Sequence, residues 1–163
     1  MDTAPGPKAV TIVAAAVLPV ALAAVIGNLA TIPNLAPWYA GLVKPWFNPP
    51  NGVFGPVWTL LYLMMATAFW RVLRLTPPTP GRRAAIGWFL AQMALNAAWS
   101  VAFFGARSPL AGVIVIGWLI VTLAATIRAF AGLDRLAAAL LVPYFAWVSF
   151  AAVLTTAVWW LNR

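Results

Sequence analysis

The residues best suited to chemistry form a series at helical spacing inside one long apolar run. The series is Trp88, Gln92, Asn96, Trp99 and Phe103, with steps of three or four residues that place all five on one face of a helix. An amide in hydrocarbon is costly unless it is paired, so this face is expected to point into a bundle. Two interpretations stay open for the amides: hydrogen bonds to neighbouring helices, or contacts to a bound molecule.

Two other apolar runs carry aromatic stripes. Trp58 and Tyr62 lie one turn apart near the start of one run, and Trp147 lies between Pro143 and Ala151 in another. Counting residues from the helix ends puts the first stripe in the same half of the membrane as the end of the polar face, and Trp147 near mid-membrane. Together the three faces predict one aromatic cavity, with a few amide and indole donors, that suits a flat and largely apolar ligand.

The connector 38–50 is rich in proline and tryptophan, which predicts a structured loop rather than a tether. Proline lacks the donor N–H and cannot continue a helix. Large rings such as Trp38 and Trp46 belong at a membrane interface, over a pocket, or both. We expect this loop to cover the cavity, with Lys44 at the mouth to meet an acidic substituent.

The composition excludes several classes of chemistry. Only 7% of the residues are charged, against about 25% in a soluble domain, so the chain is an integral membrane protein. There is no histidine or cysteine, and the only acidic residues are Asp2 and Asp134. Thiolate or imidazole metal sites, haem ligation by those side chains, carboxylate proton relays and Ser-His-Asp catalysis are therefore excluded. We expect no metal and no resident cofactor.

Five segments are long and apolar enough to span a membrane, which predicts an all-α bundle in a single domain, 1–163, with a structured first loop. Gly132 suits a left-handed cap at the end of the fourth segment, and Asp134 suits an N-cap at the start of the fifth. The predicted spans are about 9–30, 53–75, 84–104, 110–130 and 136–161.

Basic residues predict the orientation. The net charge is +8, but these residues cluster at the ends of the spans, which favours lipid headgroups over nucleic acid as their partner. Seven of the ten Lys and Arg residues lie on the side of the N-terminus, which predicts a cytoplasmic N-terminus in an inner membrane; the choice between inner and outer membrane stays open. Small residues along the third span allow close packing inside the bundle or a homodimer. The high alanine and arginine content is typical of a GC-rich bacterial genome.

An ordered set of these residues resembles the TspO/MBR family of tryptophan-rich sensory proteins, and the resemblance covers nearly the whole chain. The chain departs from the cholesterol-recognition pattern of animal members, which needs a tyrosine between an aliphatic and a basic residue near the C-terminus, because it has Trp159 and Trp160 there. The set comprises Trp38-Tyr39, Lys44-Pro45-Trp46, Pro49-Pro50, Val53-Phe54, Trp58, Tyr62, Gln92, Asn96, Trp99, Phe103-Phe104, Pro143-Tyr144 and Trp147.

The resemblance implies a five-helix membrane protein, often dimeric, with a pocket capped by the first loop. It implies binding of porphyrins and other tetrapyrroles, sterol or benzodiazepine-site ligands. Trp58 and Asn96 match residues that hydrogen-bond the ligand, and Trp147 matches a pocket wall. Trp58 and Trp147 are also the candidates for light-dependent porphyrin degradation. The alternatives are a transporter of porphyrin or sterol, against which the missing coupling carboxylates stand, and a helical scaffold.

Overall fold

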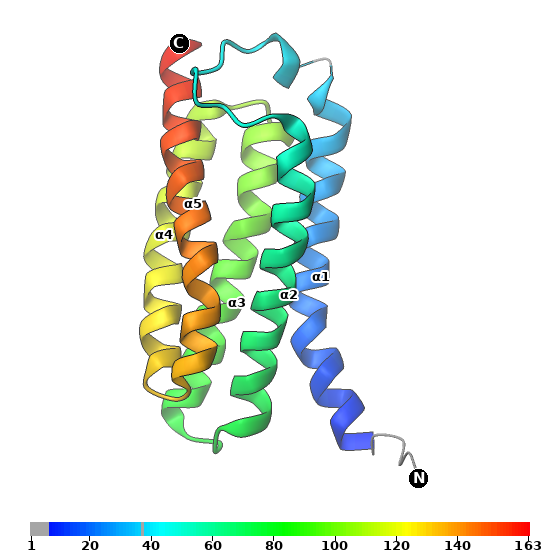
Figure 1. The fold of residues 1–163 in the computed structure, drawn as a ribbon, viewed down its shortest axis with the longest axis vertical. Helices are drawn as coiled ribbons and strands as arrows, with labels where there is room; N and C mark the ends of the chain where they lie inside the picture. The colour runs from blue at the N-terminus through cyan, green and yellow to red at the C-terminus, as the bar shows by residue number, and fades with distance from the viewer. Residues whose placement is uncertain (1–6, 37) are drawn as a thin grey trace.

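The computed structural model describes residues 7–36 and 38–163, and within them every long element is a helix. Figure 1 shows the helices standing side by side as one bundle, with the connector from α1 to α2 crossing one end. This confirms the predicted all-α architecture. The helices are α1 Pro7–Leu35, α2 Asn51–Leu75, α3 Pro80–Ser100, α4 Pro109–Ala131 and α5 Arg135–Leu161, with a short 3₁₀ turn at Tyr39–Gly41 and a π-helical turn at Val101–Gly105.

Helix starts follow local capping chemistry. The Thr79 side chain accepts a hydrogen bond from the Arg82 N–H at 3.2 Å and is followed by proline, so α3 begins four residues before the predicted span. Asp134 caps α5 as predicted, because its Oδ1 accepts from the N–H groups of Leu136 and Ala137 at 2.9 and 3.1 Å. Both starts are thus set by one side chain each.

The predicted left-handed cap at Gly132 is wrong. Its φ is −74°, so it keeps the right-handed geometry of the helix that it follows. The turn closes instead through Phe130, whose carbonyl accepts from the N–H groups of Leu133 and Asp134 at 2.9 and 2.7 Å. A chain that continues the right-handed turn in this way needs no residue at positive φ.

The order of helices around the bundle is α1, α2, α5, α4, α3. Each helix packs against its two neighbours in that ring, while α2 and α3 touch only slightly despite being consecutive. The first loop and the π-helical turn lie at one end, which we call the loop end (Figure 1). The short connections α2–α3 and α4–α5 lie at the other, which we call the base end. The ring order places the start of α2 beside the end of α5.

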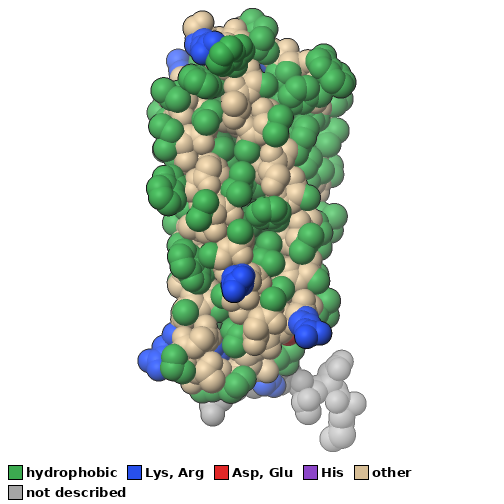
Figure 2. Space-filling model, turned by 90° about the vertical axis from the view of Figure 1, so that its left-hand side faces the viewer, with side chains coloured by type: hydrophobic (Ala, Val, Ile, Leu, Met, Phe, Trp, Pro, Cys, Tyr) green, Lys and Arg blue, Asp and Glu red, His purple; other side chains and the backbone are tan. Residues whose placement is uncertain are grey.

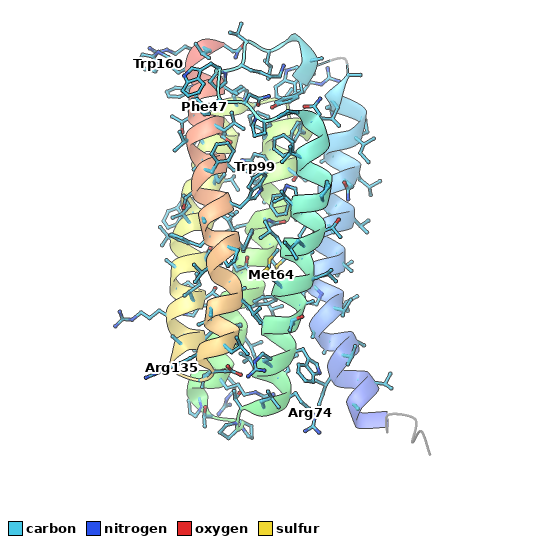
Figure 3. The ribbon with its side chains drawn as sticks, viewed as in Figure 1. Phe47, Met64, Arg74, Trp99, Arg135 and Trp160 are labelled. Atoms are coloured by element: carbon cyan, nitrogen blue, oxygen red, sulfur yellow. The ribbon has the colours of Figure 1, made fainter. Side chains whose placement is uncertain are left out.

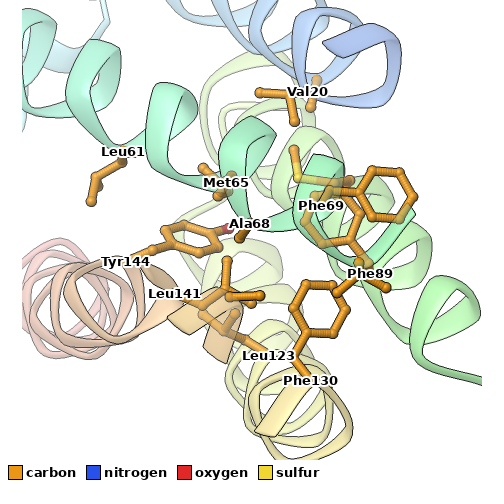
Figure 4. Packing of buried hydrophobic residues seen from close by; sticks show 14 of the residues in the cluster. Val20, Leu61, Met65, Ala68, Phe69, Phe89, Leu123, Phe130, Leu141 and Tyr144 are labelled. Carbon is orange, nitrogen blue, oxygen red and sulfur yellow. The ribbon is translucent and has the colours of Figure 1, made fainter. Parts of the chain in front are cut away.

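The base half of the bundle has a dense apolar core. Phe89 stacks on Phe69 with ring centroids 4.1 Å apart and on Phe130 at 5.9 Å, both with interplanar angles of 14°. Figure 4 shows these rings beside Met65, which is fully buried. Stacked rings at this distance leave no room for a guest molecule.

Two arginines at the base end are engaged by the protein itself. Arg82 donates to the carbonyls of Val72 and Leu73, which closes the end of α2. The Arg71 guanidinium contacts the Asp134 carboxylate at 2.9 Å. Loss of hydration opposes ionisation of Asp134, but hydrogen bonds from the backbone of Ala137 and from Arg71, with the Arg71 charge, lower the pKa of the carboxyl.

The outer surface of the bundle suits a lipid environment. All five long helices are long and apolar enough to cross a membrane. Figure 2 shows hydrophobic side chains over the whole height of one face, with most of the visible Lys and Arg side chains toward its two ends. Figure 3 places Arg74 and Arg135 at the base end and Trp160 at the loop end. The protein is therefore an integral membrane protein with five spans.

Candidate ligand pocket beneath the first loop

The centre of the loop half is a chain of three polar side chains from three helices. The Tyr62 hydroxyl donates to Asn96 Oδ1 at 3.3 Å, and Asn96 Nδ2 donates to the Tyr144 hydroxyl at 2.8 Å. Asn96 is 5% exposed and Tyr144 is fully buried. The first interpretation of Asn96, hydrogen bonds to neighbouring helices, is therefore realised here. The sequence indicates Tyr144 only as part of a motif, because a tyrosine in an apolar run carries no signal that it will pair with an amide.

Gln92 lies one turn closer to the base and has no such partners. Its side chain is fully buried, yet neither its Oε1 nor its Nε2 has a hydrogen bond within the described part of the chain. The indole Nε1 of Trp99 is buried without a partner in the same way. Buried polar atoms without partners are rare and costly, so these three atoms call for a bound molecule or water that satisfies them.

The inward face of α3 differs from the predicted one at its start. Gln92, Asn96 and Phe103 are buried as expected, but Trp88 is 43% exposed and faces outward. The neighbouring Phe89 takes the interior position and joins the ring stack of the base half. The inward series therefore starts at Gln92.

Aromatic rings surround the polar centre. Trp58 lies 5.2 Å from the Tyr62 ring and 6.1 Å from the Tyr144 ring, measured between centroids. Trp99 stacks on Phe103 at 5.4 Å with an interplanar angle of 16° (Trp99 is labelled inside the bundle in Figure 3). These contacts bring together residues from α2, α3, α5 and the π-helical turn.

The π-helical turn is a feature that the sequence did not reveal. The Ala106 N–H donates to the Val101 carbonyl five residues earlier, at 2.7 Å. Phe103 in this turn packs directly on Gly112 of α4, where an added Cβ would lie only 2.8 Å from the Phe103 ring. Single π-helical turns occur often at functional sites, because the extra residue changes which side chains face inward.

The first loop is folded onto this end, as its composition predicts. Tyr39 is 6% exposed and its hydroxyl donates to Asn48 Oδ1 at 3.0 Å, and burial raises the pKa of this hydroxyl. Trp38 packs edge-on against Phe103 at 5.4 Å. The pocket interpretation of Trp38 is thus compatible with its place beside a pocket ring.

Two side chains fasten the loop in place. Asn162, at the end of α5, accepts from the Val43 N–H and donates to the Val43 carbonyl, both at 2.9 Å. Lys44 Nζ donates to the carbonyls of Ala40 and Leu42 at 3.3 and 3.1 Å and lies 4.7 Å from the Tyr39 ring centre. The lysine therefore stabilises the conformation of the loop in this structure, and its role toward an acidic ligand stays a prediction.

A groove between α2 and α5 has a volume of about 420 Å³, and its lining does not include Gln92, Asn96 or Trp99. Trp147 lines the groove together with Pro143, and its ring lies 5.9 Å from Phe54 and 5.6 Å from Phe150. A volume of this size falls within the ~300–1,000 Å³ of small-molecule sites. The groove and the polar centre share α2 and α5 as walls.

The structure thus brings most of the predicted site residues to one half of the bundle. Trp46 does not join them, because it is 95% exposed and contacts Phe47 beside it. Ala151 is partly buried and packs against the core on α5. The predicted site residues placed in the loop half or on its groove are Trp38, Trp58, Tyr62, Gln92, Asn96, Trp99, Phe103 and Trp147.

Comparison with known proteins decides the family. The TspO/MBR family profile matches residues 15–161. The chain belongs to the TspO/MBR family. It is 44% identical over 133 residues to the tryptophan-rich protein TspO of Chlorobaculum tepidum, which covers 80% of this chain and 83% of the relative. Its identity to the TspO of Archaeoglobus fulgidus is 35% over 156 residues, covering 91% and 95% of the two chains.

The relatives of this TspO/MBR chain extend beyond bacteria and archaea. The human translocator protein is 41% identical over 130 residues, covering 75% of this chain and 73% of the relative. The match to the family profile covers the first loop and all five helices in part or whole, since it runs from α1 into the last turn of α5. The resemblance inferred from the tryptophan-rich motifs is confirmed.

Proposed function

We propose that this chain is a membrane ligand-binding, sensory protein that binds tetrapyrroles such as porphyrins beneath the first loop. The observation that carries the proposal is the set of buried atoms without partners, the Gln92 amide and Trp99 Nε1, which lie on α3 on either side of Asn96. A porphyrin offers a flat apolar face to the rings and polar groups to the amide and indole. Sterol and benzodiazepine-site ligands share the apolar part of this chemistry.

Access from the bilayer supports an apolar ligand. The α2–α5 groove is lined mainly by apolar side chains, including Leu60, Leu61 and Trp147. Leu60 is 59% exposed on the outer surface of α2, where the bilayer lies. A ligand dissolved in lipid can therefore reach Trp147 without crossing water, while the fastened first loop covers the end of the bundle.

The test is a titration of protoporphyrin IX in the dark, followed by quenching of tryptophan fluorescence. Trp58→Phe and Asn96→Ala should each weaken saturable quenching by about tenfold, which corresponds to ~1.4 kcal/mol. Trp118→Phe is the matched control, because this indole is 62% exposed on the outside of α4. If quenching rises linearly with porphyrin concentration and is the same in all three variants, the porphyrin only partitions into detergent.

Light-dependent degradation of porphyrin is a second candidate, favoured by the indoles of Trp58 and Trp147 in the same half of the bundle. A photoexcited porphyrin can take one electron from an indole, which leaves an indole radical cation and a porphyrin radical anion. Dioxygen then adds to the reduced macrocycle and is the oxidant that is reduced as the ring opens, and this needs no acid–base pair. Bleaching under light should be slowed by Trp147→Phe but not by Trp118→Phe. Bleaching equal to that in protein-free detergent would remove this function.

Transport of porphyrin or sterol is the alternative from a different class. A transporter would move its ligand across a sealed proteoliposome, whereas a receptor would bind it without flux. We also propose the homodimer and the cytoplasmic N-terminus from the sequence patterns given above. Crosslinking in membranes tests the first, and accessibility of cysteines introduced on each side tests the second.

A further inference from the structure

A second groove lies at the base end, far from the first loop, between the start of α3 and the end of α4. Its volume is about 460 Å³. The α3 side is formed by Gly81, Ala84 and Trp88, and the α4 side by Ala125 and Arg128, with Gly132 just beyond the helix. The groove shares no residue with the α2–α5 groove, so it is a separate site.

The groove has one charged side chain, and that charge has no protein counterpart. Arg128 is exposed and makes no ion pair or hydrogen bond with the described part of the chain. Asp134, the acidic residue of the described part, is already engaged by Arg71 at 2.9 Å and by the start of α5. Arg128 lies three residues before the end of α4, about 4.5 Å along the axis, so its long side chain can extend toward lipid headgroups at the base end.

The rest of the groove is apolar and open. The Trp88 ring is 43% exposed beside it, and tryptophan prefers the membrane interface. Small side chains at Ala84 and Ala125 leave a slot between the helices that faces the bilayer. The apolar slot has the chemistry to hold one acyl chain, and the unpaired arginine beside it has the charge to bind the phosphate of the same lipid.

We propose that this groove binds an anionic phospholipid, with the phosphate on Arg128 and an acyl chain along Trp88 between α3 and α4. Charge complementarity favours this occupant over a second copy of the chain, which carries the same net charge of +8. Arg74 and Arg135 at the same end add to the positive field (Figure 3). They do not line the groove and serve to attract rather than to position the lipid.

The test is native mass spectrometry of the full chain in detergent with phosphatidylglycerol or phosphatidylcholine of identical acyl chains. Wild-type protein should retain phosphatidylglycerol preferentially. Arg128→Gln should lower this retention at least about fivefold, and Ala125→Phe, which fills the slot without changing charge, should do the same. Arg74→Gln is the matched control, since it removes the same charge at the same end, and should retain the lipid within about twofold.

Three results would overturn the site. Equal retention of the two lipids would show that charge does not select the occupant. Equal losses in Arg74→Gln and Arg128→Gln would reduce the effect to the general field of the base end. Dissociation of a dimer by Ala125→Phe with unchanged lipid retention would assign the groove to a second copy. Unfolding temperatures of all variants identify any loss caused by misfolding, and Arg128→Gln, at an exposed position, is expected to fold.

Discussion

The two halves of the bundle differ in how their rings pack and in whether their inward-facing polar groups have partners. In the base half, Phe69, Phe89 and Phe130 form a ring stack, and the partly buried carboxylate of Asp134 is paired with Arg71. In the loop half, rings meet mostly edge-on or tilted, and the atoms of Gln92 and Trp99 lack partners. Polar atoms without partners are tolerated only where something compensates for them. With the proposed function, the comparison predicts that the interior of the base half serves stability and the interior of the loop half holds the porphyrin.

The largest effect expected is loss of stability in the base half. Phe89→Ala removes the middle ring of the stack and leaves a cavity, which should lower the free energy of unfolding by about 3 kcal/mol or more. Protoporphyrin IX affinity of the folded fraction should stay within about twofold, because none of the three stacked rings lines the α2–α5 groove. Thermal unfolding in detergent and the dark titration check both parts. A large loss of affinity would break the division into two halves.

A substitution in the loop half should have the opposite result, with a clear loss of porphyrin affinity and a smaller loss of stability. Gly112→Ala would place a Cβ 2.8 Å from the Phe103 ring and 3.3 Å from Thr155, so Phe103 must move. We expect porphyrin affinity to fall about tenfold with a destabilisation of about 1–3 kcal/mol. Gly117→Ala on the same helix is the control, since an added Cβ there meets nothing within 4 Å. Equal behaviour of the two variants would contradict the role of the Phe103 contact.

The fastening of the first loop should affect rates more than stability. Asn162→Ala removes two hydrogen bonds to Val43, each worth about 1 kcal/mol or less at this exposed position. The loop amides should exchange with solvent faster, and bound porphyrin should dissociate faster. Thr156→Val is the control, because the Thr156 hydroxyl bonds only to its own helix, at Ala152. Unchanged exchange at Val43 would show that the loop is held by its rings alone.

The smallest effect concerns the pair at the base end. The lowered pKa of Asp134 means that its ionised form is stabilised in the folded protein, so this stability is present above the ordinary pKa and is lost as pH falls through the folded value. Asp134→Asn keeps a good N-cap residue but removes the ion pair with Arg71, and should cost about 1 kcal/mol or less at neutral pH. Unfolding followed from neutral to acidic pH should show the acid-induced loss in wild type only. A parallel loss in the variant would mean that another group titrates.

Much of this division can be predicted from the sequence, because membrane spans and polar faces follow from simple spacing. The steps from Gln92 to Phe103 identify the inward face, and Asp134 identifies the start of α5. Spacing fails where the backbone departs from a regular helix or where two adjacent residues compete. The π-helical turn is an example of the first case. The second case is the start of α3, where Phe89 and not the predicted Trp88 lies in the interior.

Other features depend on long-range contacts that no local pattern records. Asn162, for example, bonds to Val43, which lies 119 residues away in the sequence. The contacts of Lys44 are local, to the carbonyls of Ala40 and Leu42, but the sequence pattern does not indicate them either. The ring order that sets α2 beside α5, and so creates the groove at Trp147, is likewise a property of the assembled bundle. These contacts explain why the predicted residues gather in one half while their individual roles differ.

The most direct test of the central claim is the variant Gln92→Leu, assayed for both unfolding and binding. Leucine has a similar volume and removes two buried polar atoms that have no partner. If Gln92 is kept for a ligand, the ligand-free protein should unfold at the same or a higher temperature while protoporphyrin IX binds about tenfold more weakly. A lower unfolding temperature with unchanged porphyrin affinity would contradict the account and make Gln92 a structural residue.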